Sequence, residues 1–367
     1  MNGTIYMPVG EVCSSISDTY REKKNMVTLI NTSDVLEGRV LNHERVPNSN
    51  LKGQFKKTFQ RDDILYSEIR PQNRRFAYVD FSPIDYIAST KLMVIRAKKD
   101  VVSPKYLYYF LKNSSTVAEL QLLAETRSGT FPQITFSEVA NLTIPVPSLA
   151  VQEVIVQTMQ CLEDKITCNE QINDNLQQQA QAIYSSMFID NPDPAWSHGH
   201  LSDLITVKYG KDHKKLADGI YPVYGSGGIM RYVERPLYNK ESVLIPRKGT
   251  LNNVMYVNQP FWSVDTMFYT EMKLPNVAKF VYHFVKAKDL ASMNAGSAVP
   301  SMTTDILNAM EVVIPSASAL EEFESLVAPM YEAMEANDVQ SKALSQIRDT
   351  LLPKLMSGEI DVSDVQL

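Results

Sequence analysis

The 367-residue sequence contains only three cysteines, Cys13, Cys161 and Cys168, and none of them belongs to a CxxC pair. This spacing excludes a disulfide framework and a cysteine-based zinc site, and it predicts free thiols in a reducing cytoplasm. No run of about eighteen apolar residues occurs, so we expect no transmembrane helix and no membrane partner. The N-terminal segment MNGTIYMPVGEVCSS lacks the basic and apolar regions of a secretory signal.

The sequence also lacks the short motifs that carry common chemistries. It has no Walker A, GxSxG or HExxH pattern, and no Asn/Asp-Pro-Pro-aromatic motif of the methyltransferase type. The glycine-rich run Tyr224–Gly228 is not followed by Gly-Lys-Ser/Thr, which leaves only tight turns that bring backbone amides near a ligand. His198 and His200 have no third ligand beside them, so no metal site is expected. These absences favour a binding or scaffold role over catalysis.

The longest uninterrupted pattern lies in residues 151–188, which contain no Gly and no Pro. Every seventh residue, with a second set four later, is apolar except at Asn169 and Asn173, and the surrounding positions are mostly polar. This narrow stripe predicts a coiled-coil helix, about 57 Å long at a rise of 1.5 Å per residue. Since one helix cannot bury its own stripe, the helix needs a partner.

The partner lies in the same chain, because the stripe recurs 168 residues later with Asn337 at the position of Asn169. The segment before the helix repeats as well, with Phe131–Thr135 aligned to Val299–Thr303. The sequence thus predicts a pseudo-two-fold repeat of globule and helix, with the two helices packed antiparallel. The seam residues expected at their contact are Ile155, Leu162, Asn169, Leu176, Phe323, Met330, Asn337 and Leu344.

Antiparallel packing determines which residues should meet at the middle and at the end of the two helices. Asn169 and Asn337 would meet at the centre, where a polar pair fixes the register at a cost in stability. The alternative is that each Asn tolerates partial exposure. The same packing places the end of the second helix, near Leu355, beside the entry of the first globule near Val9.

The repeat divides the chain into four predicted segments: a globule at 1–150, a helix at 151–190, a globule at 191–316 and a helix at 317–360. Short runs rich in Val, Ile, Tyr and Phe indicate strands in the globules, so the fold class is α+β. The net charge is −6, but the globules carry +4 and +2, whereas the helical regions carry −5 and −7. A basic face of a globule can therefore attract a polyanion although the whole chain is acidic.

The most basic stretch is residues 39–75, in which arginines and lysines alternate with Phe55, Phe59, Tyr66 and Phe76. Such a mixture suits contacts with the phosphates and bases of a nucleic acid. It is also compatible with a solvated loop that covers core aromatics.

Over nearly its whole length, the chain resembles the specificity subunit of a type I restriction-modification enzyme. The resemblance is carried by Tyr224–Gly228, Arg247–Thr250, Trp262–Thr266, Phe131–Ile134 and the ending Leu351–Ile360. It implies two homologous target-recognition domains, each reading one half of a split site in double-stranded DNA, separated by two long antiparallel coiled-coil helices. It further implies that the helices dock two methyltransferase subunits and that restriction or motor subunits join the complex.

The resemblance implies that this cytoplasmic chain has no catalytic residue and no metal, and that S-adenosylmethionine and ATP bind to partner subunits. Two alternatives from other classes stay open, namely a fragment of a single-chain restriction or modification enzyme and a coiled-coil scaffold without a DNA role. The residues expected to contact DNA are Lys56, Lys57, Arg61, Arg70, Arg74, Arg75, Gln133, Lys208, Tyr224, Ser226, Gly227, Arg247, Lys248, Thr250 and Asp265.

Overall fold

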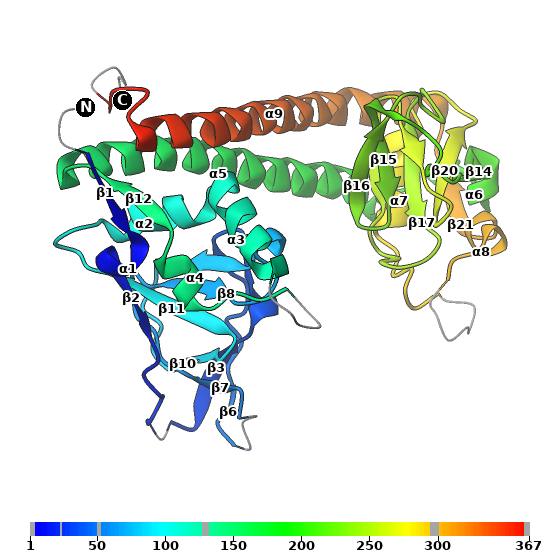
Figure 1. Cartoon of the computed structure of the whole chain (residues 1–367). Coiled ribbons are helices and arrows are strands. Elements are labelled where there is room, and N and C mark those ends of the chain that lie inside the picture. Colours follow the sequence, from blue (N-terminus) through cyan, green and yellow to red (C-terminus); the bar gives the residue numbers. More distant parts are fainter. Residues whose placement is uncertain (1–3, 23, 50–52, 127–131, 294–300, 363–367) are drawn as a thin grey trace. The chain divides into compact units, whose positions relative to one another are not determined.

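The computed structural model describes residues 4–22, 24–49, 53–126, 132–293 and 301–362 (Figure 1). The chain forms two compact units, of which unit 1 comprises Met1–Asn169 with Val339–Leu367, and unit 2 comprises Glu170–Asp338. Two long helices, α5 (Leu149–Ser185) and α9 (Ala317–Ser357), each contribute one part to either unit. The division of the chain into four segments, with boundaries after residues 150, 190 and 316, stays a prediction.

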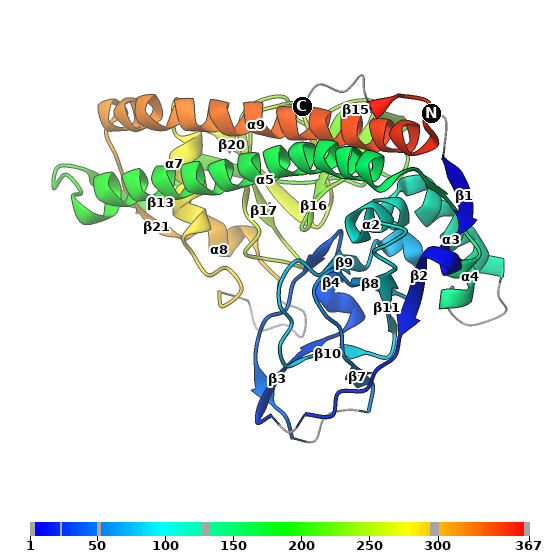
Figure 2. The ribbon, with the colours of Figure 1, turned by 90° about the vertical axis from the view of Figure 1, so that its left-hand side faces the viewer.

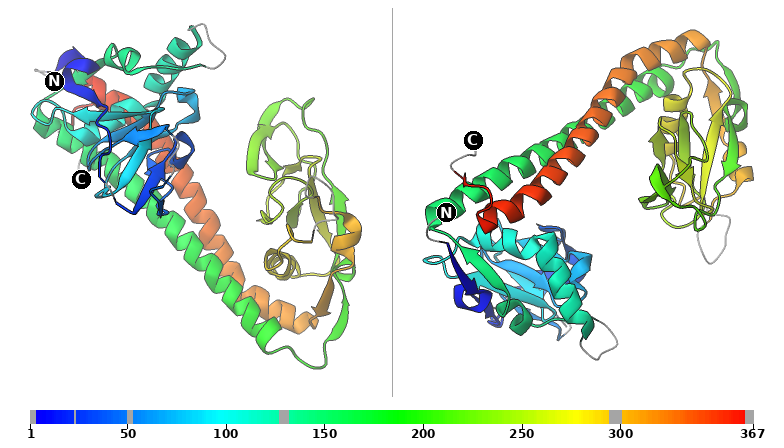
Figure 3. Two further views of the ribbon diagram at one scale, coloured as in Figure 1. Left: turned by 90° about the horizontal axis from the view of Figure 1, so that it is seen from below. Right: turned by 45° about the horizontal axis from the view of Figure 1, so that its top comes forward.

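Both helices bury the predicted seam. Each of its eight residues is buried or half-buried, and Ile155, Asn169 and Phe323 are fully buried. The helix α9 continues through Pro353 to Ser357, and α5 ends in the π-helical turn η3 (Ser186–Asp190). Within each unit α5 and α9 lie side by side in every view (Figures 2 and 3).

The helices are antiparallel in unit 1, as the contacts between their polar side chains show. Glu163 of α5 lies 3.8 Å from Arg348 of α9. Six residues later on α5, the Asn169 amide donates to Gln340 Oε1 at 2.9 Å and to Ser341 Oγ at 3.1 Å. The residue number on α9 thus falls as the number on α5 rises, which confirms the predicted direction.

Unit 2 contains the matching polar contact of the seam. The Asn337 amide donates to Asn173 Oδ1 at 2.9 Å, and the Asn173 amide donates to Asp338 Oδ1 at 2.9 Å. In these hydrogen bonds Asn337 therefore pairs with the residue four positions after Asn169. The direct pair of Asn169 with Asn337 stays a prediction.

The described globule of unit 1 contains two four-stranded sheets. One sheet is antiparallel and has the strand order β2 (Cys13–Ile16), β11 (Leu92–Ala97), β8 (Ile64–Ser67) and β9 (Phe76–Tyr78). The other has the order β6 (Val46–Pro47), β3 (Met26–Ile30), β10 (Tyr86–Ser89) and β7 (Phe55–Lys57), with β3 and β10 parallel. Shorter elements complete it: β1 (Ile5–Pro8), β4 (Val35–Leu36), β5 (Arg39–Val40), β12 (Thr143–Val146), η1 (Thr32–Asp34), η2 (Pro71–Asn73), α1 (Val9–Val12), α2 (Pro104–Lys112), α3 (Ser114–Thr126) and α4 (Phe136–Ala140).

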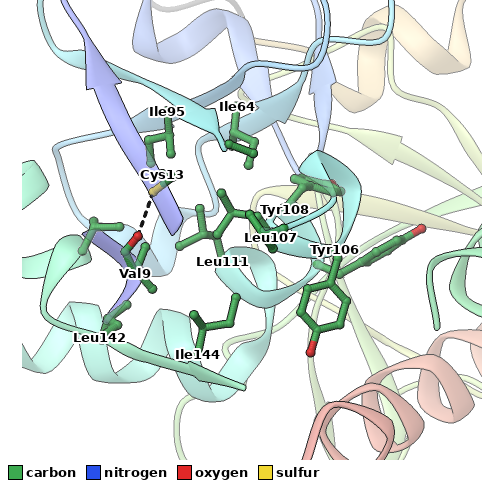
Figure 4. Close-up of a cluster of buried hydrophobic side chains, with 14 of the residues drawn as sticks. Val9, Cys13, Ile64, Ile95, Tyr106, Leu107, Tyr108, Leu111, Leu142 and Ile144 are labelled. Carbon is green, nitrogen blue, oxygen red and sulfur yellow. Dashed lines mark hydrogen bonds between the residues drawn. The ribbon is translucent and has the colours of Figure 1, made fainter. Parts of the chain in front are cut away.

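One apolar core joins the first globule to the helices of unit 1. Around α2 it includes Val9, Leu107 and Leu142, which Figure 4 shows facing one another. Leu355 of α9 belongs to the same cluster as Val9, so the end of α9 and the entry of the first globule share one apolar core, in agreement with the prediction. Cys13 donates from Sγ to the Val9 carbonyl at 3.2 Å, and burial raises the pKa of this thiol to about 12.

Unit 2 repeats this plan. Its antiparallel sheet has the order β14 (Ile205–Tyr209), β20 (Met267–Met272), β17 (Ser242–Pro246) and β18 (Met255–Val257), and its second sheet has the order β16 (Gly228–Val233), β15 (Asp218–Gly225) and β19 (Trp262–Ser263). The remaining elements are β13 (Ser197–His200), β21 (Glu311–Ile314), α6 (Leu201–Leu204), α7 (Ala278–Lys286) and α8 (Thr304–Asn308).

The internal repeat is visible in single hydrogen bonds. In unit 1 the Val9 amide donates to the Leu142 carbonyl at 2.8 Å, and in unit 2 the Leu201 amide donates to the Met310 carbonyl at 2.8 Å. The pairs β1–β12 and β13–β21 are both antiparallel and lead into these contacts. In the repeated motif, Phe131, Val299 and Pro300 lie outside the described residues. None of the described helices combines the length and the apolar character that a membrane span requires.

Candidate nucleic-acid interface

In unit 2, three chain segments meet at the turn that follows β17. The backbone amides of Arg247 and Lys248 donate to the Thr266 carbonyl at 2.9 and 3.2 Å, which ties this turn to the loop before β20. The Asn253 side chain donates to the Ser226 carbonyl at 2.8 Å, which ties it to the tip of the β15–β16 hairpin. The turn is therefore held on one side by backbone hydrogen bonds and on the other by the Asn253 side chain.

Gly249 allows the turn and the hairpin tip to approach each other. Its φ is +86°, a conformation that side chains other than glycine rarely adopt, and a Cβ added there would lie 2.6 Å from Ser226 Oγ. Lys248, Gly249 and Thr250 are exposed on the outside of this turn. A ligand can consequently reach both side chains and backbone.

The guanidinium group of Arg247 is held in one orientation. Its Nη1 donates to the Asp265 carbonyl at 3.1 Å, and its centre lies 5.5 Å from the ring centroid of Tyr209, which is 53% exposed. An aromatic neighbour and a carbonyl fix the plane of a guanidinium group while leaving other N–H groups for a ligand. Such an arginine suits bidentate recognition of a base edge or a phosphate.

The predicted DNA contacts of the second globule are thus largely brought together. Ser226, Gly227, Arg247, Lys248, Thr250 and Asp265 lie in the three segments that form this cluster. Lys208, on β14, pairs with Glu271 at 3.5 Å on the neighbouring strand.

Tyr224 is largely buried, unlike the exposed residues of the turn. Its side chain is 9% exposed and belongs to a core cluster with Phe261, and its hydroxyl accepts a hydrogen bond from Gln259 at 3.3 Å. Burial also raises the pKa of this hydroxyl. Tyr224 therefore supports the hairpin from within, and its contact with DNA stays a prediction.

Two predicted cations of the first globule also have internal roles. The ammonium group of Lys57 donates to the carbonyls of Thr90 and Leu92 at 3.1 and 2.8 Å, and burial lowers its pKa. Arg75 donates from Nη1 to the carbonyls of Ser33 and Val35 at 3.0 and 3.3 Å. Both side chains satisfy backbone acceptors within the globule, and their assignment as DNA contacts stays a prediction.

The other predicted residues of unit 1 are spread over its surface. Lys56, Arg61 and Arg70 are exposed. Arg74 donates to Ser114 Oγ at 2.9 Å and lines a cavity of about 100 Å³ together with Arg348 of α9, so it lies at the junction of globule and helix. Arg70 and Arg74 flank the same short helix η2, whereas Lys56 lies on β7 and Arg61 follows that strand.

Gln133 belongs to a polar group that sequence reasoning did not identify. The Lys91 ammonium lies 3.4 Å from both Gln133 Oε1 and Glu68 Oε2. Glu68 and Lys91 are absent from the predicted set, as is Tyr209 in unit 2. An alignment of the strands β8 and β17 would have identified Glu68, since it shows which turn of the first globule corresponds to Arg247–Thr250.

The backbone confirms that these turns are equivalent. The Glu68 amide donates to the Lys91 carbonyl at 3.0 Å, as the Arg247 amide does to the Thr266 carbonyl. Ile134 donates to the Glu68 carbonyl at 2.9 Å, and its counterpart Met302 donates to the Arg247 carbonyl at 3.0 Å. Single bridges link Ile69 with Gln133 and Lys248 with Ser301. One scaffold thus presents different side chains in the two units.

No cluster of three or more potential metal ligands occurs among the residues that the structure describes. His198 and His200 lie on β13, at the edge of its two-stranded pair with β21. The described part of the chain therefore offers turns and cations for a polyanion, with no constellation of metal ligands beside them.

A duplicated α+β globule, attached to antiparallel helices and exposing one equivalent turn per copy, defines a modular recognition protein. The model of the "Type I restriction modification DNA specificity domain" matches residues 6–178 and 195–323. The chain therefore belongs to the family of type I restriction-modification DNA specificity proteins, and each unit carries a copy of the domain. Proteins of this family are specificity components without catalytic function, which confirms the prediction of a specificity subunit.

Individual relatives agree with the family. The chain is 27% identical to the Type I restriction enzyme HindI specificity subunit of Haemophilus influenzae, over 91% of this chain and 94% of that protein. It is 25% identical to the MjaIX specificity subunit of Methanocaldococcus jannaschii, over 77% of both. The S subunit of a type I system from M. genitalium has a similar fold, with a TM-score of 0.56 at 18% identity, over 97% of this chain and 96% of that one.

Proposed function

We propose that each globule reads one half of a bipartite site in double-stranded DNA. The main support for this proposal is a pair of equivalent turns, one in each unit. The same backbone hydrogen bonds hold both turns, but the turns expose different side chains. Different side chains on one scaffold suit two recognition modules that share a binding mode but differ in sequence preference. Because α5 and α9 each continue from one unit into the other, the spacing of the half-sites should depend on these helices.

A domain exchange tests this proposal. Residues 201–316 are replaced by the matching segment of a relative, and adenine methylation is mapped in cells that express the hybrid with its partner subunits. We expect one half of the recognised sequence to change and the other half to remain. A change in both halves, or in neither, would contradict the assignment of one half-site to each globule.

We further propose that the helices dock two methyltransferase subunits through apolar residues outside the seam. Leu326 and Ile347 of α9 are 47% and 51% exposed and lie three heptads apart, and Ile172 of α5 is 40% exposed at the same heptad position. Exposed large apolar residues at a repeated helical position favour a protein partner. Two other apolar residues outside the seam, Leu320 of α9 and Val151 of α5, are left out of this surface, because Leu320 is buried and Val151 is half-buried against the first core.

Charge substitutions on α9 test the docking. The variant with Leu326→Asp and Ile347→Asp should lose co-purification with the methyltransferase subunit. The matched control changes their exposed polar neighbours, Ser325→Asp and Gln346→Asp, and should keep it. Circular dichroism verifies that both variants keep their helices, and sedimentation reports whether the complex holds two methyltransferase subunits. Equal co-purification of both variants would refute the proposed surface.

The proposal also assigns the chemistry to other subunits. S-adenosylmethionine is expected on the methyltransferase subunits and ATP on the restriction or motor subunits, all of them in the cytoplasm. Equilibrium dialysis of the isolated chain with either labelled compound should show no retention, whereas the assembled complex should retain both.

A further inference from the structure

In the equivalent turns of the two units, arginine occupies different residue positions. The step that Arg247 occupies in unit 2 is occupied by Glu68 in unit 1, as the shared backbone hydrogen bonds show. Two residues further on, unit 2 has Gly249 and unit 1 has Arg70. Each turn thus carries an arginine beside β8 or β17, in a position where the other turn has a different residue type.

Arg70 adopts a conformation that its side chain makes unfavourable. Its φ is +46° and its ψ is 76°, in the left-handed region, and Gly249 at the equivalent step has a φ of +86°. A residue with a Cβ pays about 1–2 kcal/mol for this conformation, and glycine avoids that cost. The turn holds Arg70 there through its backbone, since its amide donates to the Pro132 carbonyl at 3.1 Å and its carbonyl accepts from the Asn73 amide at 2.8 Å.

A strained, exposed arginine in place of glycine indicates a role for its side chain. Glycine would give the turn a lower conformational energy at this position, and unit 2 has glycine there. In unit 2 an arginine in place of Gly249 would require the Ser226 side chain to move, because its Oγ lies 2.6 Å from the position of the added Cβ. There Arg247 is positioned instead by Tyr209 and by the Asp265 carbonyl.

We propose that Arg70 and Arg247 are the specificity-determining arginines of the two half-sites, and that each contacts the N7 and O6 atoms of a guanine in the major groove. This inference rests on the proposed function. Bidentate contact of arginine with guanine is the commonest specific contact between proteins and DNA, and one such pair discriminates strongly against other bases. Exposed cations elsewhere on the first globule, such as Lys56 and Arg61, then contact phosphates and set affinity without specifying sequence.

The test uses the full chain, purified in complex with its methyltransferase subunits, and selection from a library of random DNA duplexes. The key variant is Arg70→Gly, because glycine relieves the strained conformation and unit 2 shows that the turn folds with it. We expect its thermal unfolding midpoint to stay equal or rise. Discrimination at one guanine of one half-site should fall about ten- to hundredfold, while the other half-site is selected as before.

A second variant, Arg247→Lys, probes the other turn with the positive charge retained. Lysine cannot reproduce the bidentate fork, so guanine discrimination in the second half-site should fall while the salt dependence of binding is preserved. Gly249→Ala is the structural control, and it should lower stability because its Cβ meets Ser226 Oγ.

The outcomes separate this inference from the function on which it rests. If the wild-type complex selects no preferred sequence, the proposed function itself fails, and the inference fails with it. If wild type selects a bipartite sequence but Arg70→Gly leaves that sequence unchanged or alters both halves, only the inference is overturned. Uniform weakening of all duplexes with a shallower salt dependence would assign Arg70 to a phosphate and likewise overturn it.

Discussion

His283 is fully buried where α7 of the second globule meets both long helices. Its Nδ1 lies 2.8 Å from Gln181 Oε1 on α5, and its Nε2 lies 3.0 Å from the Tyr331 hydroxyl on α9. A neutral imidazole satisfies both partners, because Nδ1–H donates to the amide oxygen while Nε2 accepts from the hydroxyl. Burial accordingly lowers the pKa of His283 to about 4. We predict that His283→Gln removes an acid-sensitive step from the stability of unit 2.

The magnitude follows from the two pKa values of His283. The side chain has a pKa of 6.5 in the unfolded chain and about 4 in the folded unit, so between these values the unfolded state binds more protons. Stability is therefore full above pH 6.5 and is lost as the pH falls towards 4. The loss amounts to about 3 kcal/mol, with a slope of at most about 1.4 kcal/mol per pH unit.

Tryptophan fluorescence isolates the relevant unit, because both tryptophans of the chain, Trp196 and Trp262, lie in unit 2. Urea unfolding is measured from pH 4 to pH 7.5 for wild type and for His283→Gln. Other groups of the unit also contribute to each pH profile, so the relevant quantity is the difference between the slopes of wild type and His283→Gln. The control Tyr331→Phe keeps the histidine and should keep most of the pH dependence. Parallel pH profiles for wild type and His283→Gln would refute the reasoning.

Three further predictions concern single positions. Asn173→Leu and Asn337→Leu should be non-additive by about 1 kcal/mol in thermal unfolding followed by circular dichroism, because each single change leaves one amide without its seam partner; additive effects would contradict the contact. Gln152→Leu should lower the free energy of unfolding of unit 1 by about 2–4 kcal/mol, because the fully buried side chain makes three hydrogen bonds to backbone groups that leucine leaves unpaired. An unchanged midpoint of urea unfolding would refute this. Lys57→Met should lower stability without altering the salt dependence of DNA binding, because its ammonium group binds backbone carbonyls. Arg61→Met should reduce the slope of log affinity against log salt by about 1. The reverse pattern would refute the assignment of Lys57 to an internal role and of Arg61 to a phosphate.

The sequence predicted the features that depend on local periodicity. A stripe every three or four residues can be recognised along one segment, because helical geometry places those residues on one face whatever the rest of the chain does. The same applies to the repeat, since an offset of 168 residues links two seams and also predicted that Leu355 lies near Val9. The resemblance to specificity subunits rested on short motifs of the same local kind.

The site was predictable only where a motif coincided with a turn. Arg247–Thr250 and the hairpin tip at Ser226 are compact sequence signals, and the fold brings them together. The first globule has no such glycine-rich signal in its equivalent turn, where Arg70 stands in place of glycine. Glu68 and Lys91 were therefore missed, although they occupy the corresponding backbone positions.

By itself, the sequence determined the duplicated plan, the seam and the family of this protein. Only the tertiary structure decided which backbone groups the predicted cations contact. Lys57 and Arg75 donate to carbonyls of segments that are distant in sequence, as Arg247 does to the Asp265 carbonyl. A charged side chain takes whichever partners the folded backbone leaves within reach, because a backbone acceptor that loses water contacts needs another donor. That balance depends on contacts between remote segments, and no local pattern of residues encodes it.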